Sequence, residues 1–281
     1  MRPFIEKKDI LIGSDPEVFL KTNKDAFISA HIFLGRLVKG TKYSPEETDY
    51  GAIQVDGTAI ELNTNPTPDP AKFAELVKKG VDDTLARFKE HQLSLSRSSV
   101  VKLDEMFMND RRNKPGLTMG CDPDFNAWMM GVPNPRPDED IPMRSAGGHL
   151  HIGWLKDYYD GAHQDEAMAV VRQLDYALGL WSLFADSEGA ERRKLYGKAG
   201  AFRLKPYGVE YRVLSNFWMF DDKLCKEAHQ RAQTAAWLSL RGISFEEEFG
   251  LLAMQAIENG VITPDVVACH NKVTGMIQAA A

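Results

Sequence analysis

Four short segments of this chain alternate ionisable residues with apolar ones, and this alternation constrains the fold more than any other feature. Successive side chains of a β-strand point to opposite faces, so each segment would present one polar and one apolar face. The segments lie far apart among the 281 residues, at 13–20, 55–63, 147–154 and 207–216. Together they predict a sheet with one face rich in charged groups.

Other segments predict helices that are separated from the strands along the chain. Residues 163–185 and 222–241 carry apolar residues at helical spacing. Because strands and long helices do not alternate regularly, the pattern favours an α+β fold with an antiparallel sheet. We predict a single domain over residues 1–281, in which 12–218 hold the strand motifs and 222–281 are helical.

The first two strand segments carry carboxylates. Asp15 and Glu17 are two residues apart, which in a strand puts them on one face and about 7 Å from each other. Glu61 lies between two large aliphatic residues of an otherwise apolar strand. A solvent-facing edge strand, which tolerates Pro16, is the alternative for the first pair, and an amphipathic strand with Glu61 in water is the alternative for the second.

The other two segments carry a histidine pair and a Glu-x-Arg pair. His149 and His151 share a strand face, and the glycines before them allow another backbone or a phosphate to approach closely. This spacing favours ligands over structural histidines. Glu210 and Arg212 also share a face, where a cross-strand salt bridge is the alternative. Basic residues precede them at Arg192, Arg193, Lys194, Lys198, Arg203 and Lys205.

These groups would gather on one polar sheet face. Burial of so much uncompensated charge would be prohibitive, so we expect divalent cations among the carboxylates. The oxygen-rich set favours Mg²⁺ or Mn²⁺ over zinc. The face would contain Asp15, Glu17, Glu61, His149, His151, Glu210 and Arg212.

Charge and cysteine usage exclude several classes of protein. The net charge of −6 argues against a nucleic-acid binder, which normally carries a basic face. Cys121, Cys225 and Cys269 are far apart and form no CxxC pair, which is typical of reduced thiols and not of a structural zinc site. The N-terminus lacks a signal-peptide core, and the longest apolar run, 177–185, is too short to cross a bilayer. We expect a soluble, cytoplasmic protein without a membrane partner.

Four motifs, taken in order, resemble the phage COOH–NH2 ligases of type 2. They are Gly-Ser-Asp-Pro-Glu from residue 13, Asp-Gly-x-x-x-Glu-Leu-Asn-x-x-Pro from residue 56, Gly-Gly-His-x-His-x-Gly from residue 147 and Tyr-Gly-x-Glu-Tyr-Arg-x-Leu-Ser-Asn from residue 207. The resemblance covers about residues 12–218. It implies a glutamine-synthetase-like catalytic domain, with a curved antiparallel sheet packed by helices on its outer face. A phage-encoded protein of this kind would act in the host cytoplasm.

The resemblance also implies roles for individual residues. Metal ligands for two magnesium ions would be Asp15, Glu17, Glu61, His149 and Glu210. Groups that bind ATP and its phosphates would be His151, Arg193, Lys198, Arg203 and Arg212. Glu17, Glu210 and Arg212 would form the catalytic set. Asp15 stands where glutamine synthetase has a glutamate, and its side chain is shorter.

Two further segments have open interpretations. Residues 120–128 are similar to the first motif and would either contact substrate or form a polar loop that enters a strand. Cys121 within them is not expected to be a nucleophile, because no base is evident for it. Residues 131–142 contain four prolines and several acids, which predicts an irregular loop that is either exposed or a lid.

The implied activity is ATP-dependent ligation of a small-molecule or peptide carboxylate to an amine. The carboxylate would attack the γ-phosphate of ATP to give an acyl phosphate, and the amine would then displace phosphate. One alternative is a non-haem metal oxygenase, or cupin-like protein, that uses the two histidines and one glutamate. Another is a non-catalytic binding protein with the same fold. Neither the substrates, the general base nor the oligomeric state follows from the sequence.

Overall fold

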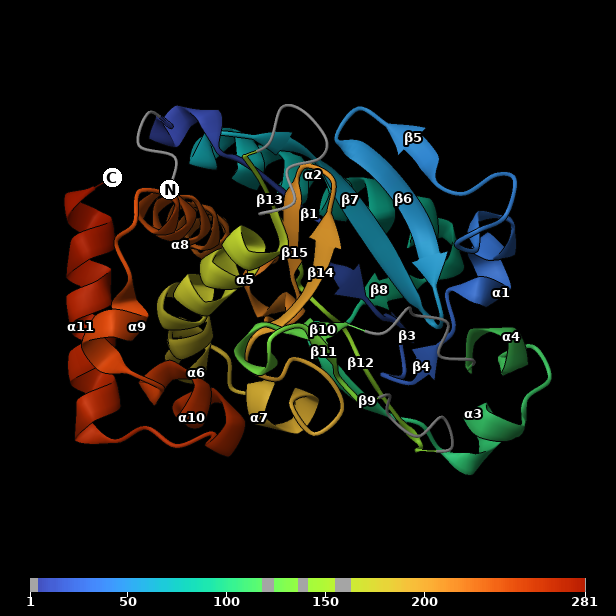
Figure 1. Ribbon diagram of the computed structural model, residues 1–281. Coiled ribbons are helices and arrows are strands. Elements are labelled where there is room, and N and C mark those ends of the chain that lie inside the picture. The colour runs from blue at the N-terminus through green and yellow to red at the C-terminus, as the bar shows by residue number, and fades with distance from the viewer. Residues whose placement is uncertain (1–4, 118–123, 136–140, 155–162, 281) are drawn as a thin grey trace.

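An antiparallel sheet of ten strands forms the centre of the molecule, and most helices lie on one side of it (Figure 1). The computed structural model describes residues 5–117, 124–135, 141–154 and 163–280. The strand order is β11-β10-β14-β15-β13-β1-β7-β6-β5, and β2 also pairs with β7. The strands are β1 Leu11–Ser14, β2 Glu17–Val18, β5 Glu46–Thr48, β6 Gly51–Asp56, β7 Ala59–Thr67, β10 Phe125–Asn126, β11 Val132–Pro133, β13 Leu150–Gly153, β14 Ala201–Lys205 and β15 Gly208–Tyr211.

Two small sheets and the helices complete the fold. In one small sheet β3 Leu20–Thr22 pairs with β4 Phe27–Ile28 on one side and β8 Leu93–Leu95 on the other, and in the second β12 Met143–Ser145 pairs with β9 Val100–Lys102. The α-helices are α1 His31–Leu34, α2 Pro70–Phe88, α3 Glu105–Asn109, α4 Lys114–Leu117, α5 His163–Leu174, α6 Leu180–Ala185, α7 Gly189–Arg192, α8 Asp222–Leu240, α9 Phe245–Phe249, α10 Leu252–Asn259 and α11 Pro264–Ala279. Short helical turns are η1 Lys7–Asp9, η2 Gly35–Leu37, η3 Lys89–His91, η4 Ala127–Met129, the π-helical η5 Asp175–Gly179, and η6 Asn216–Trp218.

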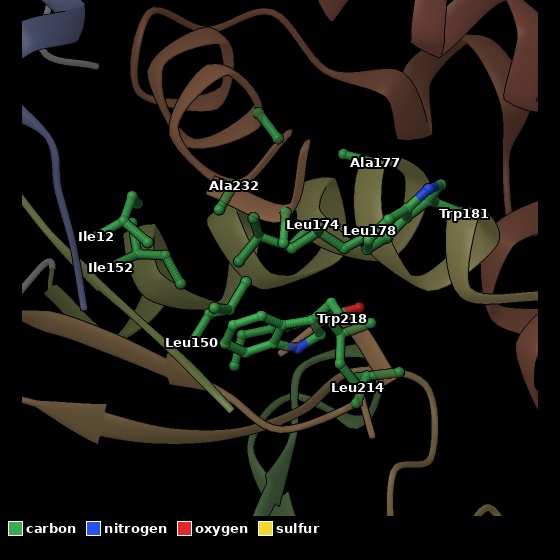
Figure 2. Close-up of a cluster of buried hydrophobic side chains, with 14 of the residues drawn as sticks. Ile12, Leu150, Ile152, Leu174, Ala177, Leu178, Trp181, Leu214, Trp218 and Ala232 are labelled. Atoms are coloured by element: carbon green, nitrogen blue, oxygen red, sulfur yellow. The ribbon is translucent and has the colours of Figure 1, made fainter. Parts of the chain in front are cut away.

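The apolar face of the large sheet packs against three long helices. Register places Ile12, Ile152 and Val209 side by side on β1, β13 and β15, and all three are fully buried. Helix α8 contacts β1 and β13, while α2 contacts β7 and α5 contacts β15. Figure 2 shows strand residues such as Leu150 facing Leu174, and Trp218 lying close by. Removal of this apolar surface from water is the main force that holds the helices on the sheet.

The expected combination of a large antiparallel sheet with helices is confirmed, but several strand boundaries differ from prediction. Strand β7 continues to Thr67 through Pro66, where a register shift interrupts its pairing with β1. Residues 131–142 are not entirely irregular, because Val132–Pro133 forms edge strand β11, a position where proline is tolerated. Residues 136–140, the centre of the predicted lid, lie outside the described residues.

Other sequence predictions concern cysteines and membrane spans. Cys225 and Cys269 are free, buried thiols, and Cys121 lies outside the described residues. In the described part of the chain, every helix is too short or too polar to traverse a lipid bilayer.

A buried aspartate links the helices to the strands that hold the charged face. Asp175 begins the π-helical turn between α5 and α6 and is fully buried. Its carboxylate accepts hydrogen bonds from Trp128 Nε1 at 2.6 Å, Gly200 N at 2.7 Å and Tyr211 Oη at 2.8 Å. Single π-helical turns often occur where a helix serves a functional site. Here the turn joins η4, the start of β14 and the end of β15.

The substitution Asp175→Asn tests the electrostatic state of this link. Burial raises the pKa of Asp175 to about 7, despite the hydrogen bonds from Trp128 and Tyr211. The folded protein therefore keeps a proton that the unfolded chain releases near pH ~4, so this group lowers the free energy of unfolding as pH rises from about 4 to 7. We expect the variant to lose this component, on the order of 1 kcal/mol per pH unit, in urea unfolding across that range. The exposed Asp49→Asn serves as a control, and equal pH dependence of wild type and Asp175→Asn would contradict the assignment.

Candidate functional site

The polar face of the sheet carries two rows of functional groups that register places side by side. His151, Glu210 and Arg203 are direct neighbours across β13, β15 and β14. In the other half of the sheet, Glu17 is opposite Glu61, which is opposite Gln54. Strand periodicity puts these rows on the face opposite the core.

The first row contributes to a three-ligand group that we call cluster one. Asp15, His151 and Glu210 each offer a ligand atom, and these atoms lie within 4.8 Å of one another. Asp15 Oδ2 is 3.2 Å from His151 Nε2. His149 lies beside the same carboxylates, with Nδ1 3.3 Å from Asp15 Oδ1 and 3.8 Å from Glu210 Oε1. Both histidines therefore contact cluster one.

The second row contributes to another three-ligand group, cluster two. It consists of Glu17, Asp56 and Glu61, whose ligand atoms also lie within 4.8 Å of one another. Glu17 accepts a hydrogen bond from Gly147 N at 2.8 Å, which fixes its carboxylate beside the histidine strand. Gln54 Nε2 donates to Glu61 Oε1. Cluster two is therefore a preorganised set of oxygen donors.

The two clusters have opposite electrostatic character. Burial opposes the charged form of Asp15, but the two histidines hold its pKa well below the usual range, and Arg212 helps to lower the pKa of Glu210 to about 2. Burial raises the pKa of Glu17 to about 7, with Asp56 adding to the rise. Burial and the nearby Asp15 raise the pKa of Glu61 to about 8. Cluster one therefore holds charged carboxylates, while cluster two holds protons near neutral pH.

Basic side chains surround cluster one. Arg212 Nη1 donates to Glu210 Oε1 and lies 3.3 Å from His149 Nδ1. Lys205 Nζ is 2.7 Å from Glu210 Oε2, and Arg203 Nη1 is 3.8 Å from Glu210 Oε1. Burial, followed by Arg212, lowers the pKa of His149 to about 4, so this imidazole is neutral at pH 7. A neutral imidazole is the form that can bind a metal.

Two pockets open beside the clusters. The first is rich in arginine and is lined by Glu17, Asp56, Arg144, His149, Arg192 and Arg212, among others. The second has a volume of about 550 Å³ and touches His151, with walls that include Leu11, Pro66, Trp154 and Tyr207. One pocket therefore suits an anionic group, and the other suits a flat, partly apolar one.

The structure brings together most of the residues that the sequence singled out. The carboxylates Asp15, Glu17, Glu61 and Glu210 share the polar face with both histidines, Arg203 and Arg212. Asp15 and Glu17 do not share one strand, however, because β1 ends at Ser14 and β2 begins at Glu17. The break at Pro16 sends the two carboxylates to different clusters.

Arg193 does not join this set. Its Nη1 lies 3.5 Å from Ser182 Oγ on α6, and its guanidinium interacts with Asp186, among the helices. The preceding residue, Arg192, instead lines the arginine-rich pocket and is 2% exposed. Lys198 is half-buried in the turn between α7 and β14. Arg193 thus lies away from both clusters, and its phosphate-binding role stays a prediction.

Two further residues of the site were not predicted, and a third lies in a segment whose interpretation was open. Asp56 was noted only as the first residue of the second motif, although its carboxylate lies within 4.8 Å of the ligand atoms of Glu17 and Glu61. Lys39 contacts both acids, but a lone lysine in an irregular segment gives no periodic signal. Asp124, 3.8 Å from Arg212, is the described part of the 120–128 segment that approaches the site.

Carboxylate oxygens dominate both clusters, which fits magnesium or manganese. These ions prefer oxygen ligands and accept an imidazole, and each cluster offers three donors at a spacing that one ion can bridge. Burial disfavours the charged forms of Glu17 and Glu61 and raises their pKa values to about 7 and 8, so a bound cation would stabilise the ionised forms. The residues present therefore fit two divalent ions.

Comparison with known proteins supports one family. Residues 139–241 match the family model described as phage phiEco32-like COOH.NH2 ligase-type 2. This confirms the resemblance over the segment that contains the histidine pair, the basic stretch and the Glu-x-Arg strand. The family name indicates a carboxylate–amine ligase, an enzyme that forms carbon–nitrogen bonds. No curated protein matches the chain.

The glycines before the histidine pair allow β13 to pack closely against the segment after β15. A Cβ on Gly148 would lie 2.2 Å from Ser215 O and 2.6 Å from Trp218 Nε1. A Cβ on Gly147 would lie 2.2 Å from His149 Nε2. The predicted close approach thus involves protein backbone and the histidine ring itself.

We expect Gly148→Ala to destabilise the protein by about 2–3 kcal/mol, because the methyl group meets fixed backbone. Gly275→Ala is the matched control. Gly275 lies in helix α11 with open space around it, so alanine there should stabilise by up to about 1 kcal/mol. Denaturant unfolding measures both variants, and equal stabilities would contradict the packing described for Gly148.

Proposed function

We propose that this protein is an ATP- and magnesium-dependent carboxylate–amine ligase with a glutamine-synthetase-like catalytic domain. The observation that carries the proposal is the pair of three-ligand clusters, side by side on one sheet face and flanked by arginines and lysines. Phosphoryl transfer requires this combination of metal ligands and fixed positive charge. The family match supports the ligase class.

Cluster one and cluster two would each hold one magnesium ion. Asp15, Glu210 and a histidine would bind the first, and Glu17, Asp56 and Glu61 would bind the second. When bound, such ions neutralise phosphate oxygens and favour in-line displacement at phosphorus. Gly147 N and Gln54 hold the carboxylates of cluster two in place before any ligand arrives.

The pocket beside His151 is the proposed nucleotide site. Trp154, Tyr207, Leu11 and Pro66 would enclose the adenine ring, while His151 faces the phosphates. Arg203, Lys205 and Arg212 converge on Glu210, next to where the phosphates would lie. Arginine suits this role because its fork matches phosphate geometry and remains charged.

The arginine-rich pocket is the proposed site of the carboxylate substrate. One oxygen of the substrate carboxylate would attack the γ-phosphorus of ATP and form an O–P bond. The bond between the γ-phosphorus and the oxygen of the leaving ADP would break, which gives an acyl phosphate. Arg212 and Arg192 would stabilise the negative charge of the transferring group. The amine nitrogen would then attack the carbonyl carbon, phosphate would leave, and the amine proton would pass to a base that is not assigned.

The alternative functions use less of this site. A non-haem oxygenase needs cluster one alone, and leaves cluster two and the arginine-rich pocket without a role. A non-catalytic binding protein would not need two complete ligand sets. Both alternatives therefore explain fewer of the observed groups than ligation does.

The decisive experiment measures ATP hydrolysis that depends on Mg²⁺, a carboxylate and an amine, with a panel of amino acids and amines. Glu17→Gln and Glu210→Gln each replace a carboxyl ligand with an amide and should lower turnover by about 100-fold or more, with circular dichroism unchanged. Glu47→Gln, an exposed glutamate of β5, should retain wild-type turnover. Wild-type rates in both site variants would refute the metal assignment.

Metal affinity should depend on pH in a defined direction. Because the pKa values of Glu17 and Glu61 are raised to about 7 and 8, both hold protons at pH 6 that an entering ion must displace. Affinity for Mn²⁺ should therefore increase from pH 6 to 8, with protons released. Calorimetric titration in buffers of different ionisation enthalpy measures the release, and affinity that is constant over this range would count against cluster two as a metal site.

A further inference from the structure

A lysine ammonium lies within cluster two. Lys39 Nζ is 2.9 Å from Asp56 Oδ2 and 3.0 Å from Glu61 Oε2. The Glu61 side chain is 3% exposed, whereas the Lys39 side chain is 46% exposed. The lysine thus reaches a buried carboxylate from the solvent side of the site.

The backbone at Lys39 is fixed, while the side chain has room to leave. Lys39 N donates to Val55 O at 2.9 Å, and the preceding Val38 forms a parallel bridge with Val55. The next residue, Gly40, has a φ of +83° and open space around its Cα. Since the Lys39 side chain is 46% exposed, its four methylene groups can swing the ammonium into solvent without any change in the sheet.

The position of the ammonium conflicts with the binding of a metal ion. Asp56 and Glu61 are two of the three donors of cluster two, and their ligand atoms lie within 4.8 Å of those of Glu17. The ammonium uses the same two carboxylates that a divalent ion would use. Like charges repel at this distance, so ammonium and metal cannot both occupy the carboxylates.

We propose that Lys39 is a built-in counter-ion of cluster two, which holds its carboxylates together without metal and is displaced when a divalent ion binds. The inference rests on the metal sites of the proposed function. It implies that Lys39 lowers the affinity of cluster two for metal while it stabilises the metal-free protein. A residue with a purely structural role would not have these opposite effects.

The test compares Lys39→Met with Lys42→Met, which removes the same charge from an exposed residue near the ring of Tyr43. Binding of Mn²⁺ is followed by electron paramagnetic resonance of the free ion. Lys39→Met should bind the weaker of two Mn²⁺ ions about tenfold more tightly than wild type, because no charge-assisted hydrogen bonds must break. Lys42→Met should bind like wild type. Lys39→Arg, which keeps a cation at this position, should also remain close to wild type.

Thermal unfolding gives a readout that does not depend on activity. With a chelator, Lys39→Met should melt below wild type, and with saturating Mn²⁺ the difference should disappear. Equal Mn²⁺ affinity of wild type and Lys39→Met would overturn the role of Lys39 alone. A wild-type protein that binds fewer than two Mn²⁺ ions would overturn both this inference and the proposed two-metal site.

Discussion

Repulsion between buried carboxylates is the constraint on which this structure depends. Four carboxylates from separate parts of the chain lie on one face of one sheet. Three of them are buried and one is half-buried: Asp15, Glu61 and Glu210, and Glu17. Charges of one sign at such distances destabilise a fold unless hydrogen bonds and cations compensate them. The opposite face of the same strands is mostly apolar, so the packing of helices α2, α5 and α8 holds these carboxylates near each other.

The two clusters differ in how far nearby cations neutralise the charge of their carboxylates. This difference gives the two sets of carboxyl groups different protonation states. Cluster one has histidines, Arg212 and Lys205 beside it, and the pKa of Glu210 falls to about 2. In cluster two the carboxylates have fewer cationic neighbours, and the pKa of Glu61 rises to about 8. Neighbouring carboxyl groups on one face therefore occupy different protonation states at neutral pH. Environments that push pKa values apart are typical of sites where chemistry takes place.

The sequence predicted those parts of the site that depend on strand periodicity. The alternation around His149, His151 and Glu210 is local, so it shows which residues share a face before the fold is known. Periodicity gave no information about Arg193, which was assigned from the resemblance, because the short helix α7 offers no basis for choosing between the adjacent Arg192 and Arg193. It also missed Lys39, which reaches Glu61 from 22 residues away in sequence, and Asp56, whose role depends on the β6–β7 hairpin bringing it to Glu17 and Glu61. Pairing partners, strand order and the break at Pro16 likewise depend on tertiary contacts that a single sequence does not contain.

The order of strands at the centre of the sheet has a consequence for biosynthesis. Strand β13 lies between β1 and β15. Residues 11–14 can therefore pair only after residues 150–153 have been synthesised, and all three strands can pair only after residues 208–211 have been synthesised. Contacts between such distant segments form late, since the intervening chain loses much conformational freedom when its ends meet. In a nascent chain whose β15 segment has not yet left the ribosome, Glu210 and Arg212 are not available for folding. Such a chain therefore carries Asp15 without its partners, and cluster one can form only when synthesis is well advanced.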